Sequence, residues 1–295
     1  MPEQDYVGRF APSPSGALHL GSLITAVASF VHARQADGEW LLRIEDIDPP
    51  REMPGASDQI VQALDQLELH WDRSVSFQSH RLGDYAALAE DLLQRGLAYR
   101  CRCSRKQLRV KGSAAGRYPG HCRDAGIAAA STSIRLRIDG DSSDQFDDLF
   151  QGPVSGNVDT QLGDYVIYRR DRLPAYHLAV VLDDHLQGVT HIIRGVDLLA
   201  PTFAHRHLQR TLGARTPRYG HIPVLVNAQG QKLSKRTGAH AIDLREPGKL
   251  AFQALKLLGA DPPSELKFGS PGNLWAWARN HWPMEALKDR ESIEV

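Results

Sequence analysis

Apolar residues in the first half of the chain follow strand and helix spacings in turn. Residues 5–10 predict a short strand, and a loop rich in proline, serine and glycine follows at 11–17. A helix is expected next, followed by a turn at Asp37-Gly38 and a second strand at 40–46. The apolar face of that helix contains Leu23, Ala26, Val27, Phe30 and Val31. A strand, helix and strand within about 40 residues form a βαβ unit, which predicts a parallel sheet.

Similar patterns continue along the chain. Further helices are predicted around 60–67, 85–93, 198–212 and 249–258. Strands are predicted at 133–138, 164–168, 176–182 and 190–194. Polar and apolar residues alternate through 133–138, so we expect this strand to have one solvent-facing side. The stretch from Cys101 to about Ala130 has no periodicity and predicts an insertion held together by something other than a core.

Composition points to an ordinary globular protein, with 42% hydrophobic and 24% charged residues. No apolar stretch approaches the ~20 residues of a membrane span, and the first residues lack the pattern of a signal peptide. We therefore expect a cytoplasmic protein without membrane contact. The formal net charge is zero, so any contact with nucleic acid has to be local. Arg100–Lys111 holds six Lys/Arg and no acid, and such a run is either an RNA contact or a solvated face.

Nucleotide binding is predicted from two motifs that differ from the common phosphate loops. Neither GxxxxGK[ST] nor GxGxxG occurs in the chain. Instead, His19-Leu20-Gly21-Ser22 opens the first helix, whose N-terminus offers N–H groups and positive dipole charge to a phosphate. Lys232-Leu233-Ser234-Lys235-Arg236, about 210 residues later, carries three cations and a hydroxyl that could neutralise a triphosphate. Each motif alone is compatible with a structural role, but together they favour an ATP site.

The two motifs resemble the HIGH and KMSKS signatures of class I aminoacyl-tRNA synthetases. Residues 10–16, 43–48 and 191–198 resemble the glutamyl branch of that family, and the similarity covers nearly the whole chain. Ser22 replaces the second histidine of HIGH, while Leu233 and Arg236 depart from KMSKS. The resemblance implies an α/β fold with a Rossmann-like parallel sheet, a zinc-bearing insertion and a small, mainly helical C-terminal part.

The resemblance also implies the site residues. Catalysis is expected from His19, Lys232 and Lys235. ATP, with Mg²⁺, is expected to contact Pro12, His19, Gly21, Ser22, Lys232, Ser234 and Lys235. The glutamate site is expected to contain Arg9, Phe10, Ala11, Pro12, Ser13, Glu45, Tyr176 and Arg194. An arginine suits the side-chain carboxylate and an acid suits the α-amino group, although Arg9 and Glu45 could also simply pair with each other.

Three cysteines suggest a metal site, since Cys101, Cys103 and Cys122 cluster in a chain with too few for a disulfide framework. A structural zinc takes four ligands in a tetrahedron. By chemistry alone the neighbouring His121 is the natural fourth. In the short glutamyl relatives that this chain resembles, a tyrosine completes a Cys₃Tyr site, which implies Tyr118 and one structural Zn²⁺. Three unligated buried cysteines are the alternative.

The resemblance finally implies a substrate and an acceptor. Only 59 residues follow Arg236, so we expect no anticodon-binding domain. The short paralogues of the glutamyl branch esterify glutamate onto queuosine in the anticodon of tRNA(Asp), so we expect partners L-glutamate, ATP and that tRNA, and a monomer. Alternatives are a minimal glutamyl-tRNA(Glu) synthetase and an inactive glutamate- or ATP-binding regulator. The expected parts are 1–98 and 166–217 as halves of a catalytic domain, 99–165 as the insertion, and 218–295 as the helical part.

Overall fold

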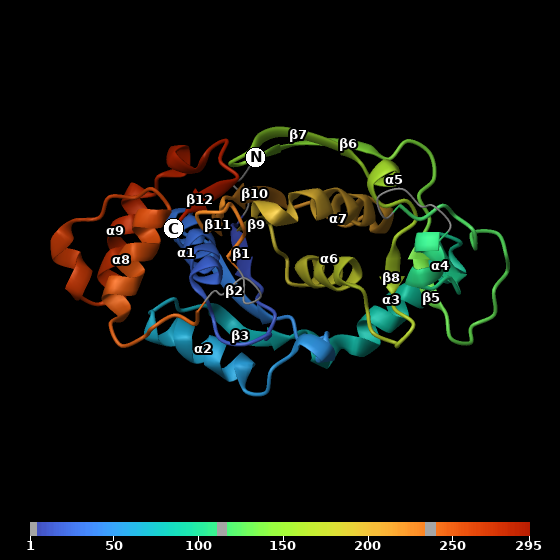
Figure 1. Ribbon diagram of the computed structural model, residues 1–295, viewed down its shortest axis with the longest axis horizontal. Helices are drawn as coiled ribbons and strands as arrows, with labels where there is room; N and C mark the ends of the chain where they lie inside the picture. The colour runs from blue at the N-terminus through green and yellow to red at the C-terminus, as the bar shows by residue number, and fades with distance from the viewer. Residues whose placement is uncertain (1–4, 111–116, 234–239) are drawn as a thin grey trace.

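A computed structural model describes residues 5–110, 117–233 and 240–295 (Figure 1). Parallel strands form its central layer: β1 (Val7–Phe10), β2 (Glu39–Ile44), β3 (Asp72–Phe77), β9 (His191–Gly195) and β10 (Arg218–Ile222). β1 pairs with β2, β2 with β3, and β9 with β10, all in parallel. Thr190 accepts a hydrogen bond from the Val7 amide, and its own amide donates to the Val7 carbonyl, so β9 starts beside β1. The predicted parallel sheet is confirmed.

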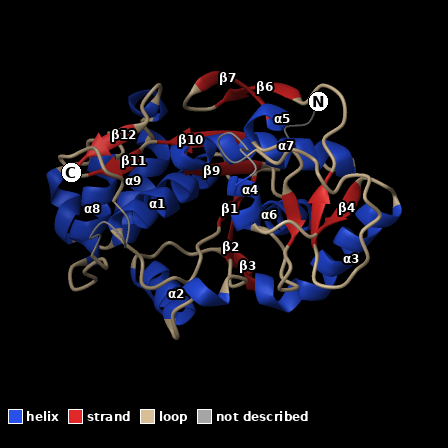
Figure 2. Cartoon of the chain, turned by 45° about the vertical axis from the view of Figure 1, so that its right-hand side comes forward, coloured by secondary structure: helices blue, strands red, loops and turns tan. Residues whose placement is uncertain are grey.

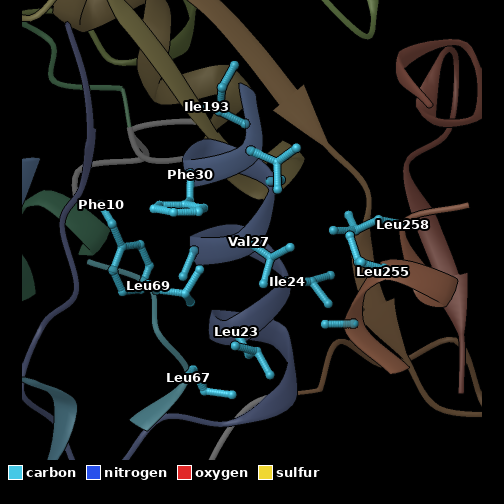
Figure 3. Close-up of a cluster of buried hydrophobic side chains, with 14 of the residues drawn as sticks. Phe10, Leu23, Ile24, Val27, Phe30, Leu67, Leu69, Ile193, Leu255 and Leu258 are labelled. Atoms are coloured by element: carbon cyan, nitrogen blue, oxygen red, sulfur yellow. The ribbon is translucent and has the colours of Figure 1, made fainter. Parts of the chain in front are cut away.

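Helix α1 (Leu20–Gln35) is the centre of the largest hydrophobic core. Its predicted apolar face is fully buried, and Ala28 and Ser29 on its other side are buried as well. Figure 3 shows side chains from several elements around it: Phe10, Leu67, Leu69, Ile193, Leu255 and Leu258. Burying one large aliphatic side chain contributes about 1.5–3 kcal/mol to the stability of the fold. The many buried side chains of α1 therefore hold this helix, and the strand β1 that precedes it, in position.

The turn after α1 requires a glycine. A Cβ on Gly38 would lie 2.6 Å from the Tyr6 carbonyl oxygen, which no side chain can tolerate. This close approach sets the start of β2 against β1, where the Glu39 amide donates to the same oxygen. The βαβ unit is therefore closed by backbone contacts as well as by its core.

The insertion is built on an antiparallel sheet of β4 (Ala98–Cys101), β5 (Ser133–Leu136) and β8 (Val166–Tyr168). A second core joins this sheet to one short helix of the insertion and to helices that precede and follow the insertion in the sequence (Figures 1 and 2). These helices are α3 (Leu82–Gln94), α5 (Val158–Gln161), α6 (Tyr176–Leu186) and α7 (Leu199–Leu212). The hairpin of β6 (Ser143–Asp148) and β7 (Gly152–Asn157) reaches back toward β10.

Helical elements dominate the C-terminal part, which packs against α1 at the end opposite to the insertion (Figure 1). It contains α8 (Pro247–Leu257), η6 (Ser264–Phe268), α9 (Pro271–His281) and η7 (Met284–Leu287). The short strands β11 (Val224–Val226) and β12 (Ser292–Glu294) pair in parallel beside them. Completing the chain are η1 (Pro49–Arg51), α2 (Ala56–Gln66), η2 (Gln78–Arg81), α4 (Arg105–Val110) and η4 (Val196–Leu198). No helix within these described ranges is both long and apolar enough to cross a membrane.

Two sequence predictions are wrong. Residues 176–182, predicted as a strand, form the first two turns of α6. Most of this helix is buried against α7 and the insertion sheet, and a buried helix shows a continuous apolar run in place of helical periodicity. The predicted solvent-facing side of 133–138 is also wrong, because every residue of β5 is buried, on both faces of the sheet. Arg135 there is buried, with its guanidinium 3.7 Å from the centre of the Tyr118 ring.

Candidate active site

The first predicted motif caps helix α1. His19 is the N-cap residue, and its Nδ1 accepts a hydrogen bond from the Ser22 amide at 3.2 Å. In return, the Ser22 hydroxyl accepts from the His19 amide at 2.9 Å. Because Nδ1 must carry a lone pair to make this bond, a neutral His19 imidazole has its proton on Nε2. The cap thus presents an N–H donor at the end of a helix where anions are favoured.

Gly21 lies between the His19 ring and the start of the second motif. A Cβ at this position would lie 3.2 Å from two atoms of the His19 ring and 3.8 Å from the Leu233 carbonyl oxygen. After the second motif, where the described chain resumes at residue 240, the Ile242 amide donates to the Leu18 carbonyl, and Ala241 forms a β-bridge with His19. The segments on both sides of the KMSKS-like loop therefore lie against the N-terminus of α1. A cavity of about 480 Å³ opens between them and α8.

Lys232 enters the loop from a short hairpin with β11 and forms a half-exposed ion pair with Asp197, 2.6 Å from Nζ to Oδ2. Asp197 lies in η4, directly after β9. The other predicted members of this motif, Ser234 and Lys235, lie outside the described residues. Because Asp197 directly follows β9, its ion pair holds Lys232 at the carboxyl end of the parallel strands, on the same edge as the end of β1.

A buried cluster of charges lies at the carboxyl ends of β1 and β2. Arg9 donates to Asp184 of α6 at 3.3 Å, and Arg43 contacts the same oxygen at 2.8 Å. Glu45 lies 3.6 Å from Arg43. Among the described residues, Arg9 is therefore paired with Asp184 and not with Glu45. Arg43 is 1% exposed, so its charge requires the acids around it.

The pKa of the Glu45 carboxyl group is raised well above its ordinary value of 4.5. Burial raises its pKa to about 7, against the lowering effect of the nearby Arg43 and Arg9 charges and with a further increase from Asp184 and Asp183. The carboxyl group therefore changes charge near neutral pH, which is common for a group that contacts a charged ligand. Its backbone amide donates to the Pro12 carbonyl and so holds the loop after β1 against the end of β2.

Arg194, at the end of β9, is 3% exposed. Its guanidinium donates to Thr202 Oγ1 at 2.6 Å, to the Leu198 carbonyl at 3.1 Å and to His221 Nε2 at 3.1 Å. Tyr176, at the start of α6, is 38% exposed, and its ring lies 5.3 Å from that of His205. Burial of the hydroxyl raises the pKa of Tyr176, while the charges of Arg194 and Arg9 act in the opposite direction. Tyr176 therefore lies near both predicted arginines.

The loop after β1 completes the candidate pocket. Phe10 is buried, Ala11 and Pro12 are half-buried, and Ser13 is exposed. The structure thus brings together the predicted glutamate residues at one edge of the sheet, where ligands bind in open α/β folds.

Several residues of this edge were not predicted. They are Arg43, Asp148, Asp183, Asp184, Thr202, His205 and His221. Two adjacent acids at the end of the apolar run 176–182 were the available signal for Asp183 and Asp184, because buried acids need a partner. Their bonds to residues about 100 to 180 positions away have no local pattern.

The cysteine cluster lies at the end of β4 and in the loop that follows. The sulfur atoms of Cys101, Cys103 and Cys122 all lie within 4.8 Å of one another. Sulfurs bound to one tetrahedral zinc lie about 3.8 Å apart, given Zn–S bonds of about 2.3 Å. The donor set therefore fits a metal ion with little rearrangement.

The Tyr118 hydroxyl lies inside this cluster, 3.4 Å from Cys101 Sγ and 3.7 Å from Cys103 Sγ. His121 is exposed, and its ring nitrogens are not among the converging metal-ligand atoms of the described residues. Tyr118 is held in place from outside the cluster: its amide donates to the Leu162 carbonyl, and the Arg135 guanidinium covers its ring.

Residues 6–268 match the family model described as tRNA synthetases class I (E and Q), catalytic domain. The chain belongs to this family. As a class I tRNA synthetase catalytic domain it is a ligase-type enzyme, and members of this family use ATP with Mg²⁺. Its α/β fold, with parallel strands and a helical C-terminal part, is the class I synthetase fold.

Curated relatives resemble this synthetase over nearly their full length. A protein of Pseudomonas putida named "Glutamyl-Q tRNA(Asp) synthetase" is 47% identical over 293 residues, which cover 99% of this chain and 96% of the relative. A protein of Pseudomonas aeruginosa with the same name is 48% identical over 277 residues, 94% of this chain and 93% of the relative. A solved glutamate tRNA ligase from Elizabethkingia meningosepticum, in complex with its amino acid, superimposes with a TM-score of 0.81 at 25% identity, covering 99% of this chain and 67% of the ligase.

Proposed function

We propose that this enzyme activates L-glutamate with ATP, without tRNA, and transfers it to the queuosine base in the anticodon of tRNA(Asp). The observation that carries the proposal is the match to glutamyl-Q tRNA(Asp) synthetases over 93–96% of their length, whereas the glutamate tRNA ligase is matched over 67%. We also propose that the enzyme acts as a monomer in the cytoplasm. The parts proposed are 1–98 with 166–217 for the catalytic domain, 99–165 for the insertion and 218–295 for the helical part.

Glutamate is proposed to bind at the carboxyl ends of β1, β2 and β9. The carboxylate of Glu45 suits the α-ammonium group, and the planar guanidinium groups of Arg9 and Arg194 suit the side-chain carboxylate. Tyr176, which is 38% exposed at the start of α6, would close one side of the site. Glutamine has the shape of glutamate without its charge, so it would leave a buried guanidinium poorly paired, which is costly.

ATP is proposed to bind along the N-terminus of α1, with Pro12, Gly21 and Ser22 near its path. The Nε2–H group of His19 can donate to a phosphate oxygen, while Lys232 and Lys235, with Ser234, contribute positive charge and a hydroxyl. Mg²⁺ would arrive with the nucleotide. An oxygen of the glutamate α-carboxylate attacks the α-phosphorus in line, the bond to the bridging oxygen breaks, and pyrophosphate leaves with the electron pair. His19, Lys232 and Lys235 stabilise the charge on that leaving group.

Zinc is the metal that we propose for the cysteine cluster, with Cys101, Cys103, Tyr118 and Cys122 as its ligands. Thiolates with one oxygen donor in a tetrahedral arrangement suit zinc, which would act as a structural link between β4 and the loop at Cys122. No step of the reaction depends on it.

Replacing Tyr118 by phenylalanine is expected to lower the zinc content of the purified protein, because the fourth ligand is lost while the ring contacts with Arg135 remain. Elemental analysis after dialysis against a chelator should show about one zinc per chain in the wild type, as one tetrahedral site implies. The His121→Ala variant is the control and should keep its zinc. The reverse pattern, loss with alanine at 121 and retention with phenylalanine at 118, would assign the fourth position to His121.

Glutamate-dependent exchange of labelled pyrophosphate into ATP, by protein stripped of RNA, tests the activation step. We expect exchange with glutamate and far less with glutamine. Because the α-ammonium group needs the charged form of Glu45, kcat/KM for glutamate should rise with pH through about 7, the raised pKa of that carboxyl. The Glu45→Gln variant should lose this inflection and at least about 30-fold in kcat/KM, the effect of losing one partner of a buried charge pair.

No exchange with any amino acid would contradict the proposed activation. Exchange with an unchanged pH profile in the Glu45→Gln variant would contradict only the role of Glu45.

The raised pKa of Glu45 also makes the stability of the fold depend on pH, in the direction opposite to that of the activity. Between the ordinary pKa of 4.5 and about 7 the folded protein holds a proton that the unfolded chain has lost, so this group's contribution to stability falls as pH rises.

A further inference from the structure

Arg194 differs from the other buried arginines of the site in the charge of its partners. Arg9 and Arg43 both contact the Asp184 carboxylate. Among the described residues, every acceptor of Arg194 is uncharged at neutral pH: the Leu198 carbonyl, the Thr202 hydroxyl, His205 Nδ1 at 3.4 Å and His221 Nε2 at 3.1 Å. Its positive charge is therefore buried and held by hydrogen bonds to neutral groups, and no carboxylate of the described residues contacts it directly.

Arg194 is linked to a carboxylate only indirectly: the His221 imidazole lies between Arg194 and Asp148. Asp148, at the end of β6, accepts from His221 Nδ1 at 2.6 Å, and both side chains are fully buried. The second oxygen of Asp148 accepts from three backbone amides, those of Phe150, Gln151 and His221. Burial alone would raise the pKa of Asp148, but these hydrogen bonds lower it, so the group is ionised.

This arrangement determines the tautomer of His221. An ionised carboxylate can only accept, so Nδ1 carries the proton. Burial and the charge of Arg194 lower the pKa of His221, against the opposing effect of Asp148, so the ring stays neutral and Nε2 keeps its lone pair. That lone pair is what receives the Arg194 Nε–H group. In the other tautomer, two N–H groups would face each other.

We propose that Asp148 and His221 are positioning residues for substrate recognition: through the His221 tautomer they orient the Arg194 guanidinium, and they leave its charge available to a carboxylate of the amino acid. This inference rests on the proposed function. A carboxylate bonded directly to Arg194 would hold it equally well but would cancel the charge that selects an anionic substrate. Interposing a neutral ring provides the orientation without that loss.

The Asp148→Asn substitution tests the proposal. Asparagine can keep the backbone contacts through its oxygen, but its NH₂ group faces Nδ1 and favours the wrong tautomer of His221, as in other carboxylate–histidine pairs. We expect KM for glutamate in pyrophosphate exchange to rise about 10- to 100-fold, the scale of losing a hydrogen bond to a charged group. KM for ATP and kcat should change less than about twofold, because the substitution removes ground-state and transition-state binding alike.

The matched control is Asp144→Asn. Asp144 lies on the same strand and pairs with Arg206 and Arg210, away from Arg194. Its KM for glutamate should remain at the wild-type value. Two substitutions at His221 separate the loss of its hydrogen bonds from a general effect on folding. In His221→Gln, the amide can donate to Asp148 and accept from Arg194, so most of the affinity for glutamate should remain. In His221→Phe both hydrogen bonds are lost, so KM for glutamate should rise as it does in Asp148→Asn.

A second readout does not depend on activity. Nitrogen NMR of the His221 ring in the ligand-free protein should show the proton on Nδ1 in the wild type and on Nε2 in the Asp148→Asn variant. A wild-type ring protonated on Nε2 would overturn the proposal, whatever the substrate is. An unchanged KM for glutamate in a variant with the switched tautomer would also overturn it. Absence of glutamate exchange in the wild type, with the expected tautomers, would instead contradict the proposed substrate.

Discussion

Replacing Asp184 by alanine is expected to lower the free energy of unfolding by about 3–5 kcal/mol, the usual cost of removing one partner from a buried ion pair. Asp184 is 2% exposed and is shared by Arg9 and Arg43. Burial raises its pKa, but the two arginines outweigh that effect and lower it overall, so the group is charged in the folded protein. Without it, two buried guanidinium groups would lose their common counter-charge.

Urea denaturation at neutral pH measures this loss, and the slope with denaturant shows whether unfolding stays two-state. The control is Asp91→Ala on α3, which removes a half-exposed pair with Arg95 and should cost about 0.3–0.5 kcal/mol. Glutamate activation should also fall in the Asp184 variant at temperatures where it is folded, because Arg9 is no longer oriented. A loss below about 1 kcal/mol would mean that the cluster relaxes or admits water.

Asp184 also has a defined pH dependence. Its pKa is lower in the folded protein than in the unfolded chain, so its contribution to stability is present above the ordinary pKa of 3.8 and is lost as pH falls through the lower folded value. Glu45, with its raised pKa, acts in the opposite direction between 4.5 and about 7. The two acids of one cluster therefore favour folding in different pH ranges, because only one of them has two arginine contacts.

Features of the fold that depend on neighbours in sequence could be predicted. The βαβ unit followed from apolar spacing, and the capping residues of α1 lie within one motif, His19 to Ser22. The cluster of three cysteines also needed only the sequence, because all three lie within 22 residues of one another in a chain without other cysteines.

Long-range burial could not be predicted in the same way. Residues 176–182 form a helix because they pack against other elements on several sides, and nothing in the run itself distinguishes this from a buried strand. Arg135 follows the polar alternation of an exposed strand face, yet the Tyr118 ring covers it. Likewise, the Asp148–His221–Arg194 chain joins residues 27 and 73 positions apart. Arg194 was predicted from the family resemblance, but Asp148 and His221 looked like isolated polar residues.

The acceptor gives the largest expected contrast, because transfer requires a hydroxyl that only one base supplies. Queuosine carries a cyclopentene diol, and one of its hydroxyl oxygens would attack the carbonyl carbon of glutamyl-adenylate, forming the ester as AMP leaves. Guanine at the same position has no such group. The relatives named glutamyl-Q tRNA(Asp) synthetase match this enzyme over 93–96% of their length, which favours this acceptor.

Three tRNA substrates make the test: tRNA(Asp) with queuosine, the same tRNA with guanine in its place, and the queuosine form without its 3′-terminal adenosine. With labelled glutamate, the first and third should be charged to similar levels and the second should stay at background. Raising the salt should weaken charging of both active substrates alike, since phosphate contacts carry affinity without sequence. Exposed residues near the insertion, such as Arg102, Lys106 and Arg170, are suited to such contacts. If trimming the 3′ end abolishes charging, the amino acid goes to the terminal adenosine, and the enzyme is a glutamyl-tRNA synthetase of the acceptor-end type.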